Sequence, residues 1–95
     1  MNTVSLPDLD PDGRQPVFDA PYTVAVGLAA GETIPEHRHA GQDITFVVHD
    51  GELSLTVDGE SVTLGAGDAA AFDGDDGVSV HASEDTQALV VFSER

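Results

Sequence analysis

Short apolar segments separated by glycine turns dominate this sequence from Tyr22 onwards. The turns recur about every eight to twelve residues, and no segment sustains a 3.6-residue apolar period. This spacing is typical of antiparallel strands closed into a barrel or sandwich, so we expect an all-β protein. Outside the central hairpins, the predicted strands cover residues 22–29, 33–39, 69–72, 78–82 and 87–92.

Two Asp-Gly pairs predict the register of the central strands. Asp58-Gly59 favours a type I′ turn, because aspartate and glycine tolerate the positive φ angles that this turn requires. The turn pairs Val57 with Glu60, Leu55 with Val62 and Leu53 with Leu64. We expect Asp50-Gly51 to form a second hairpin, which pairs Val48 with Leu53, Phe46 with Leu55 and Ile44 with Val57. One interior surface then carries Ile44, Phe46, Val48, Leu53, Leu55, Val57, Val62 and Leu64.

The first 21 residues differ from the rest of the chain, since they contain four of its five prolines. Proline disfavours helices, so we expect an extended arm (1–21) in front of a single barrel domain (22–95). Two alternatives stay open for the arm. It is either a loose tail or, around Val17-Phe18, an edge strand donated to a neighbouring subunit.

The composition excludes several classes of function. Eighteen acidic residues against three arginines and no lysine give a net charge of −15, which disfavours nucleic acid and anionic membranes as partners. The acids are scattered through every turn, which favours a halophilic protein over a cation-capturing surface. Absent cysteines exclude disulfides and thiolate metal sites. With no apolar run near ~18 residues and no signal segment, we expect a cytoplasmic protein.

Two histidines form the clearest candidate site. His37 and His39 are two residues apart, so on an extended strand both imidazoles leave the same face, with Cα atoms roughly 6.5 Å apart. Neutral imidazole is a ligand for iron, manganese, nickel, copper and zinc. The spacing therefore indicates a candidate site for a divalent transition metal.

These residues lie in a segment that resembles the first motif of the cupin family. That motif is a glycine, five residues, His-x-His, an acid three or four residues on, and a second glycine about six residues later. Gly31, His37, His39 and Gly51 occupy four of its five marks, and the resemblance extends over residues 22–92. It implies a small single-domain cupin with a double-stranded β-helix, or jelly-roll, barrel.

The acid of the first motif is the first departure from the family pattern. Counted back from the second glycine, the usual spacing puts Ile44 at this mark, whereas the longer spacing of pirin-like cupins puts Asp43 there. The hairpin register favours Ile44 as the inward-pointing residue.

The second motif departs as well. Residues 64–68 resemble its glycine-aspartate turn, but Asp73 stands where a proline is expected and Val78 where a third histidine is expected. His81 follows three residues later. By alternation Val78 and Val80 point inward and His81 outward, unless a bulge at the acidic loop reverses them.

The resemblance implies a small-molecule pocket in the barrel and a homodimer. The candidate metal ligands are His37, His39, Asp43 and His81, and the candidate substrate-binding residues are Gln42, Phe46, Val48 and Leu55. With a complete ligand set, the family implies a metal-dependent oxygenase, isomerase or lyase. The alternative is a degenerate, non-catalytic cupin that binds a small molecule or a partner protein without metal chemistry.

We predict that the protein loses stability as salt is lowered, because its excess carboxylates repel one another. Molar salt shortens the screening length from about 10 Å at 0.1 M to about 3 Å, so the melting temperature should rise with salt concentration. Thermal unfolding in dilute buffer and in molar potassium chloride measures this effect. Equal melting temperatures would refute the halophilic interpretation.

Overall fold

The computed structural model describes all 95 residues as nine β-strands and one 3₁₀-helix, η1. The elements are η1 (Leu6–Asp8), β1 (Gly13–Asp19), β2 (Tyr22–Leu28), β3 (Thr33–His37), β4 (Gln42–Asp50), β5 (Glu52–Val57), β6 (Glu60–Gly65), β7 (Ala69–Asp73), β8 (Val78–Ala82) and β9 (Thr86–Glu94). No helix in the structure has the length and apolar character needed to cross a membrane.

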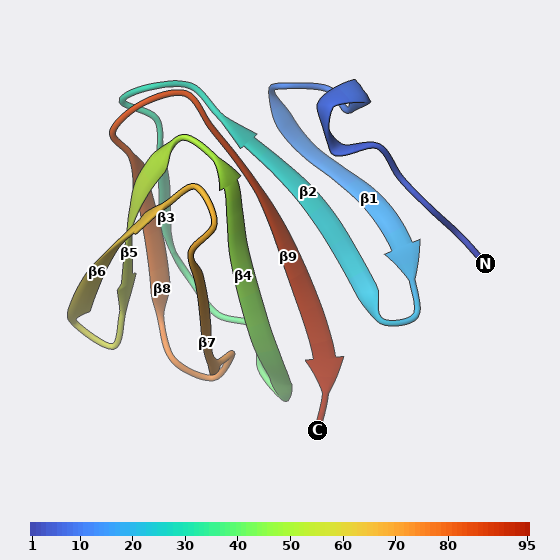
Figure 1. Cartoon of the computed structure of the whole chain (residues 1–95). Coiled ribbons are helices and arrows are strands. Elements are labelled where there is room, and N and C mark those ends of the chain that lie inside the picture. Colours follow the sequence, from blue (N-terminus) through green and yellow to red (C-terminus); the bar gives the residue numbers. More distant parts are fainter.

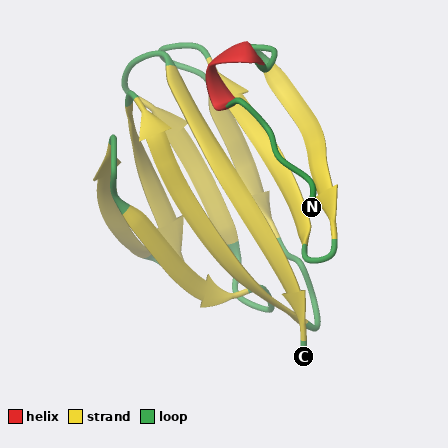
Figure 2. Cartoon of the chain, turned by 45° about the vertical axis from the view of Figure 1, so that its right-hand side comes forward, coloured by secondary structure: helices red, strands yellow, loops and turns green.

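The strands form two antiparallel sheets (Figure 1). The larger sheet has the order β1-β2-β9-β4-β7, and the smaller sheet has the order β3-β8-β5-β6. Figure 2 shows the two layers, and fourteen buried apolar residues from both sheets fill the space between them. The all-β jelly-roll fold expected from the turn spacing and from the resemblance is therefore confirmed.

The hairpin at Asp58-Gly59 has the predicted register. Asp58 and Gly59 have φ angles of 50° and 78°, as a type I′ turn requires. Val57 pairs with Glu60, Leu55 with Val62 and Leu53 with Leu64.

The second predicted hairpin, at Asp50-Gly51, is wrong. β4 pairs with β7 and β9, whereas β5 pairs with β6 and β8, so this turn carries the chain from one sheet to the other. A contact with the start of β9 holds the crossing. The Glu52 amide donates to Thr86 Oγ1 at 3.1 Å, and a Cβ on Gly51 would overlap the backbone around Thr86. This long-range contact leaves no local trace in the Asp-Gly sequence.

The predicted interior surface is nevertheless largely correct, because alternation sends the same residues inward whether the strands pair or face each other. Six of its eight residues are buried: Ile44, Phe46, Val48, Leu53, Leu55 and Leu64. Val57 is partly buried against this core. Val62 is the exception, 42% exposed, because β6 is the edge strand of the smaller sheet.

Part of the N-terminal arm is an edge strand of the barrel and not a loose tail. Gly13–Asp19 forms β1, which pairs with β2 of its own chain at the edge of the larger sheet. The arm reaches this position by crossing Gly27, where a Cβ would overlap the Pro11 carbonyl oxygen. Arg14 pairs with Val26 in this register, which brings its side chain toward the barrel interior.

We predict that Gly27→Ala displaces the arm and lowers the free energy of unfolding by about 1–3 kcal/mol, the usual cost of overpacking. Urea denaturation measures the change. Gly65→Ala is the matched control, because a Cβ there would lie 3.7 Å from Asp68 Oδ2, an ordinary contact. Equal effects of the two substitutions would contradict the role of Gly27.

Candidate functional site

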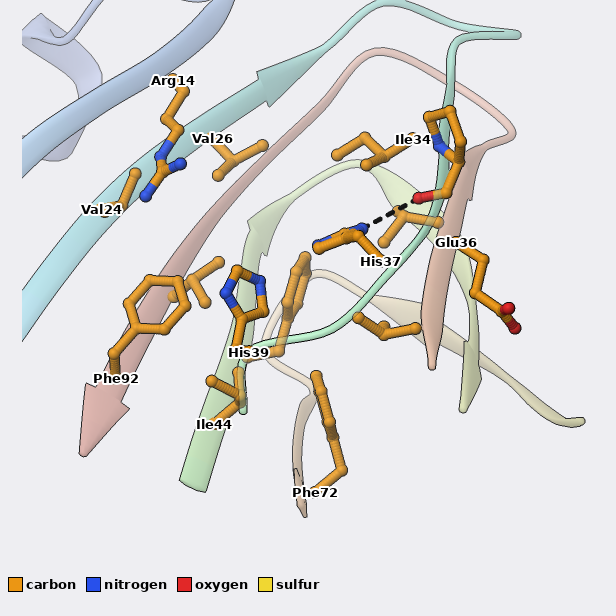
Figure 3. Close-up of a pocket in the computed structure, with 15 residues that line it drawn as sticks. Arg14, Val24, Val26, Ile34, Glu36, His37, His39, Ile44, Phe72 and Phe92 are labelled. Carbon is orange, nitrogen blue, oxygen red and sulfur yellow. Dashed lines mark hydrogen bonds between the residues drawn. The ribbon is translucent and has the colours of Figure 1, made fainter. Parts of the chain in front are cut away.

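A cavity of about 430 Å³ lies between the two sheets (Figure 3). Fifteen residues line it, and ten of them are hydrophobic. These ten come from both sheets: Val24, Val26, Ile34, Ile44, Phe46, Phe72, Val78, Val80, Val90 and Phe92. The remaining lining residues are Arg14, Pro35, Glu36, His37 and His39. The pocket is thus an apolar chamber with a few polar groups.

His37 is the last residue of β3 and points into this cavity. Its Nδ1 lies 2.9 Å from the carbonyl oxygen of Pro35 (Figure 3). A carbonyl oxygen only accepts hydrogen bonds, so Nδ1 carries the proton and donates it. In the neutral ring Nε2 is then left with its lone pair, available to a ligand.

His39 also lines the cavity, although it lies beyond the end of β3. Its backbone N–H donates to the Gly74 carbonyl at 2.7 Å, which attaches it to the acidic loop (residues 73–77). The His39 ring packs edge-on against both His37 and Phe92, with ring centroids 4.9 Å apart in each pair. The predicted histidine pair is therefore brought together, by a loop contact rather than by a continuous strand.

The pKa of His39 is lowered from its ordinary value of 6.5. Burial is the largest cause, followed by the positive charges of His37 and Arg14. His39 is therefore predominantly neutral at pH 7, where its ring offers one N–H donor and one acceptor nitrogen.

The structure does not bring the other two predicted metal ligands to this pair. Asp43 is exposed and lies 3.6 Å from Arg95, while its neighbour Ile44 points inward and is 2% exposed. His81 is exposed on β8, with its Nδ1 2.8 Å from Thr33 Oγ1. No group of three or more His, Cys, Asp or Glu side chains is arranged to hold a metal ion.

Asp43 and His81 point outward because neither β4 nor β8 has an extra residue at these positions. β4 pairs in regular register through Asp43 and Ile44 with both of its neighbours. β8 likewise pairs regularly with β5 from Val78 to Ala82. Strict alternation then sends Asp43 and His81 outward. The structure therefore does not place Asp43 and His81 beside His37 and His39.

Among the predicted substrate-binding residues, only Phe46 lines the cavity. Val48 and Leu55 are 0% and 1% exposed, but they belong to the core rather than to the cavity wall. Gln42 is half-buried at the start of β4, where its carbonyl accepts a hydrogen bond from the Gly74 amide at 2.8 Å. These three assignments are not supported, because the cavity occupies only one part of the space between the sheets.

Sequence reasoning missed Arg14, which belongs to the arm. Its guanidinium points into the cavity, toward His39 and Phe92 (Figure 3), and Nη2 lies 3.5 Å from the Tyr22 hydroxyl. Only the pairing of β1 with β2 places it there. Its rarity was a usable signal, since Arg14 is one of three cationic side chains of lysine or arginine type in the chain.

The other two arginines hold the acidic loop. Arg95 contacts Asp73 at 2.7 Å, Asp75 at 2.9 Å and Asp43 at 3.6 Å. The side-chain hydrogen bond from Arg95 is the main reason that the pKa of Asp73 is lowered. Arg38 donates to the backbone carbonyl of Asp75. Both arginines thus stabilise the loop to which the His39 backbone is attached.

Comparison with known proteins places the fold. The family described as "Cupin domain" matches residues 24–93. The structure resembles TT1209 from Thermus thermophilus (TM-score 0.88, 24% identity, covering 100% of this chain and 99% of that one). It also resembles KdgF from a Halomonas species, with a TM-score of 0.79 and 27% identity, covering 86% of this chain and 77% of that one. A third similar structure is a predicted oxalate decarboxylase from Thermotoga maritima, with a TM-score of 0.72 and 22% identity, covering 78% of this chain and 66% of that one. This chain thus spans just under two thirds of the Thermotoga protein. No curated protein matches the sequence.

We predict that His39 titrates below pH 6.5 and that Arg14→Gln raises its pKa toward that value, because one positive neighbour is removed. Histidine ring signals in NMR titrations measure both effects. Thr63→Glu on β6, which changes the net charge by the same amount outside the cavity, should leave the pKa of His39 unchanged. A normal pKa in the parent protein would contradict the geometry.

The lowered pKa of His39 also determines how stability changes with pH. Because the folded protein binds a proton at His39 less readily than the unfolded chain, this group lowers stability as pH falls from 6.5 through the lowered pKa. His39→Gln should remove that part of the pH dependence.

Proposed function

This chain belongs to the cupin family, and we propose that its barrel pocket binds a small organic molecule without a resident catalytic metal. The observation that carries this proposal is the identity of two pocket residues. Ile44 and Val78 stand where the family resemblance puts a ligand acid and a third ligand histidine, and both line the cavity at 2% and 3% exposure. Alkyl side chains offer no electron pair to a metal ion.

The remaining donors do not fit a resident metal. His37 and His39 supply two nitrogen ligands, whereas structural zinc sites use four protein ligands and catalytic sites commonly three. Glu36 is the one acid in the pocket lining, but its carboxyl group lies beside Gly77 and points away from the histidines (Figure 3). A third protein ligand is therefore missing, and the metal-dependent enzyme is the less supported alternative.

The cavity itself suits a small molecule. Its volume of about 430 Å³ is within the range of roughly 300–1,000 Å³ that ligand pockets span. Three of the four phenylalanines line it, and its polar groups are gathered around His37, His39 and Arg14. Apolar walls supply binding free energy and the polar groups orient the ligand, which supports binding as the main activity.

We predict that purified protein contains only traces of transition metal, and equal amounts in a His37→Ala/His39→Ala double variant. Metal analysis by mass spectrometry measures this. Stoichiometric metal in the parent that is lost in the double variant would overturn the proposal and favour the metal-dependent alternative.

The binding half of the proposal has its own test, a thermal-shift screen of small apolar compounds. A ligand at one hundred times its Kd stabilises the folded state by about 2.7 kcal/mol, which gives a measurable rise in Tm. Val26→Trp fills the pocket and should abolish the shifts. Val62→Trp, on the exposed edge strand, is the matched control and should keep them. Shifts that survive Val26→Trp would place binding elsewhere and overturn the proposal.

A further inference from the structure

Acidic residues outnumber arginines and histidines in the whole chain, but arginine and histidine outnumber acidic residues in the pocket lining. Of eighteen acidic residues, only Glu36 lines the cavity, whereas three of the seven arginine and histidine side chains do so. This concentration of nitrogen-bearing groups stands out against a net charge of −15. The pocket is therefore the region of this protein best suited to a negatively charged ligand group.

Arg14 is the arginine whose charge is not used by the protein itself. Arg95 is paired with three aspartates, and Arg38 donates to the carbonyl of Asp75. Arg14 forms no ion pair, and its one side-chain hydrogen bond goes to the Tyr22 hydroxyl, at 3.5 Å. A guanidinium has five N–H donors in a planar fork, so this exposed side chain at the cavity keeps most of its hydrogen-bonding capacity for a ligand.

The apolar cavity wall next to Arg14 indicates which chemical group carries the anionic group of the ligand. Its guanidinium points toward the Phe92 ring, and Phe46 and Phe72 line the same cavity (Figure 3). A free phosphate or sulfate ion would leave these apolar walls without a partner. A planar carboxylate matches the arginine fork in two parallel hydrogen bonds, and an aromatic body matches the phenylalanine walls.

We propose that the pocket binds an aromatic monocarboxylate, with the carboxylate on Arg14 beside His39 and the ring among the phenylalanines. This inference rests on the proposed small-molecule pocket and names the class of its ligand. Arg14 pairs with the carboxylate, and the N–H of the His39 ring supplies a further donor.

The test compares acids with their neutral amides of the same shape. Calorimetric titration of phenylacetate and phenylacetamide, and of 3-phenylpropanoate and its amide, is carried out at one ionic strength. In the parent protein each acid should bind about tenfold or more tightly than its amide, as hydrogen bonds to charged groups allow. Acetate, which lacks the ring, should bind far more weakly than phenylacetate.

Substitutions of Arg14 test whether this residue causes the preference for acids over amides. Arg14→Gln should remove the preference for acid over amide and leave amide binding unchanged, whereas Arg14→Lys should restore part of it. Thr63→Glu on β6, which changes the net charge by the same amount at an exposed residue outside the cavity, should keep the full preference. Unchanged melting temperatures show that the variants are folded.

Two results would overturn this inference. If amides bind as tightly as acids in the parent, the pocket binds small molecules but does not select a carboxylate, and the proposed function stands. If Arg14→Gln weakens acids and amides equally, Arg14 shapes the pocket instead of pairing with the anion. The proposed function itself fails only if neither these compounds nor the thermal-shift screen gives binding that Val26→Trp abolishes.

Discussion

Strict alternation along β4 and β8 is the constraint on which both the core and the pocket depend. β4 pairs regularly through Asp43 and Ile44, and β8 pairs regularly with β5. The ladder between β3 and β8 shifts register between Ile34 and His37, where the extra residue lies in β3, so every second side chain of β4 and β8 still enters the space between the sheets. Alternation therefore points Ile44 and Val78 into this space and points Asp43 and His81 outward. The regular register that completes the apolar core therefore also removes two ligands from a family-type metal site.

The histidine pair depends on a second and more distant set of contacts. His37 is oriented by its own strand, through the Pro35 carbonyl, but His39 lies outside the strand and is held by the Gly74 carbonyl. Gly74 belongs to the acidic loop, in which Arg95 forms ion pairs with Asp73 and Asp75. The position of one pocket residue is thus set by the far end of the chain, across a network of exposed ion pairs.

The sequence predicts the parts of this structure that depend on local periodicity. Alternation identifies the inward-facing residues, and the turn at Asp58-Gly59 gives a correct hairpin. The identical pair at Asp50-Gly51 fails, because its sheet crossing depends on Thr86, more than thirty residues away in the chain. Val62 fails for a related reason, since alternation does not reveal which strand lies at an edge. Arg14 enters the pocket only through the pairing of β1 with β2, which no local pattern specifies.

The net charge of −15 bears directly on how an anionic ligand could reach such a pocket. Long-range repulsion by the acidic surface acts over about 8 Å at physiological ionic strength but over only about 3 Å in molar salt. A direct contact between the exposed Arg14 and a carboxylate acts over about 3 Å, so salt screens it less than the repulsion from acidic groups farther away. Salt therefore weakens the repulsion more than it weakens the contact. An acidic surface and an anion-binding pocket are compatible in one small protein when ionic strength is high, and the same screening relieves repulsion among its own carboxylates.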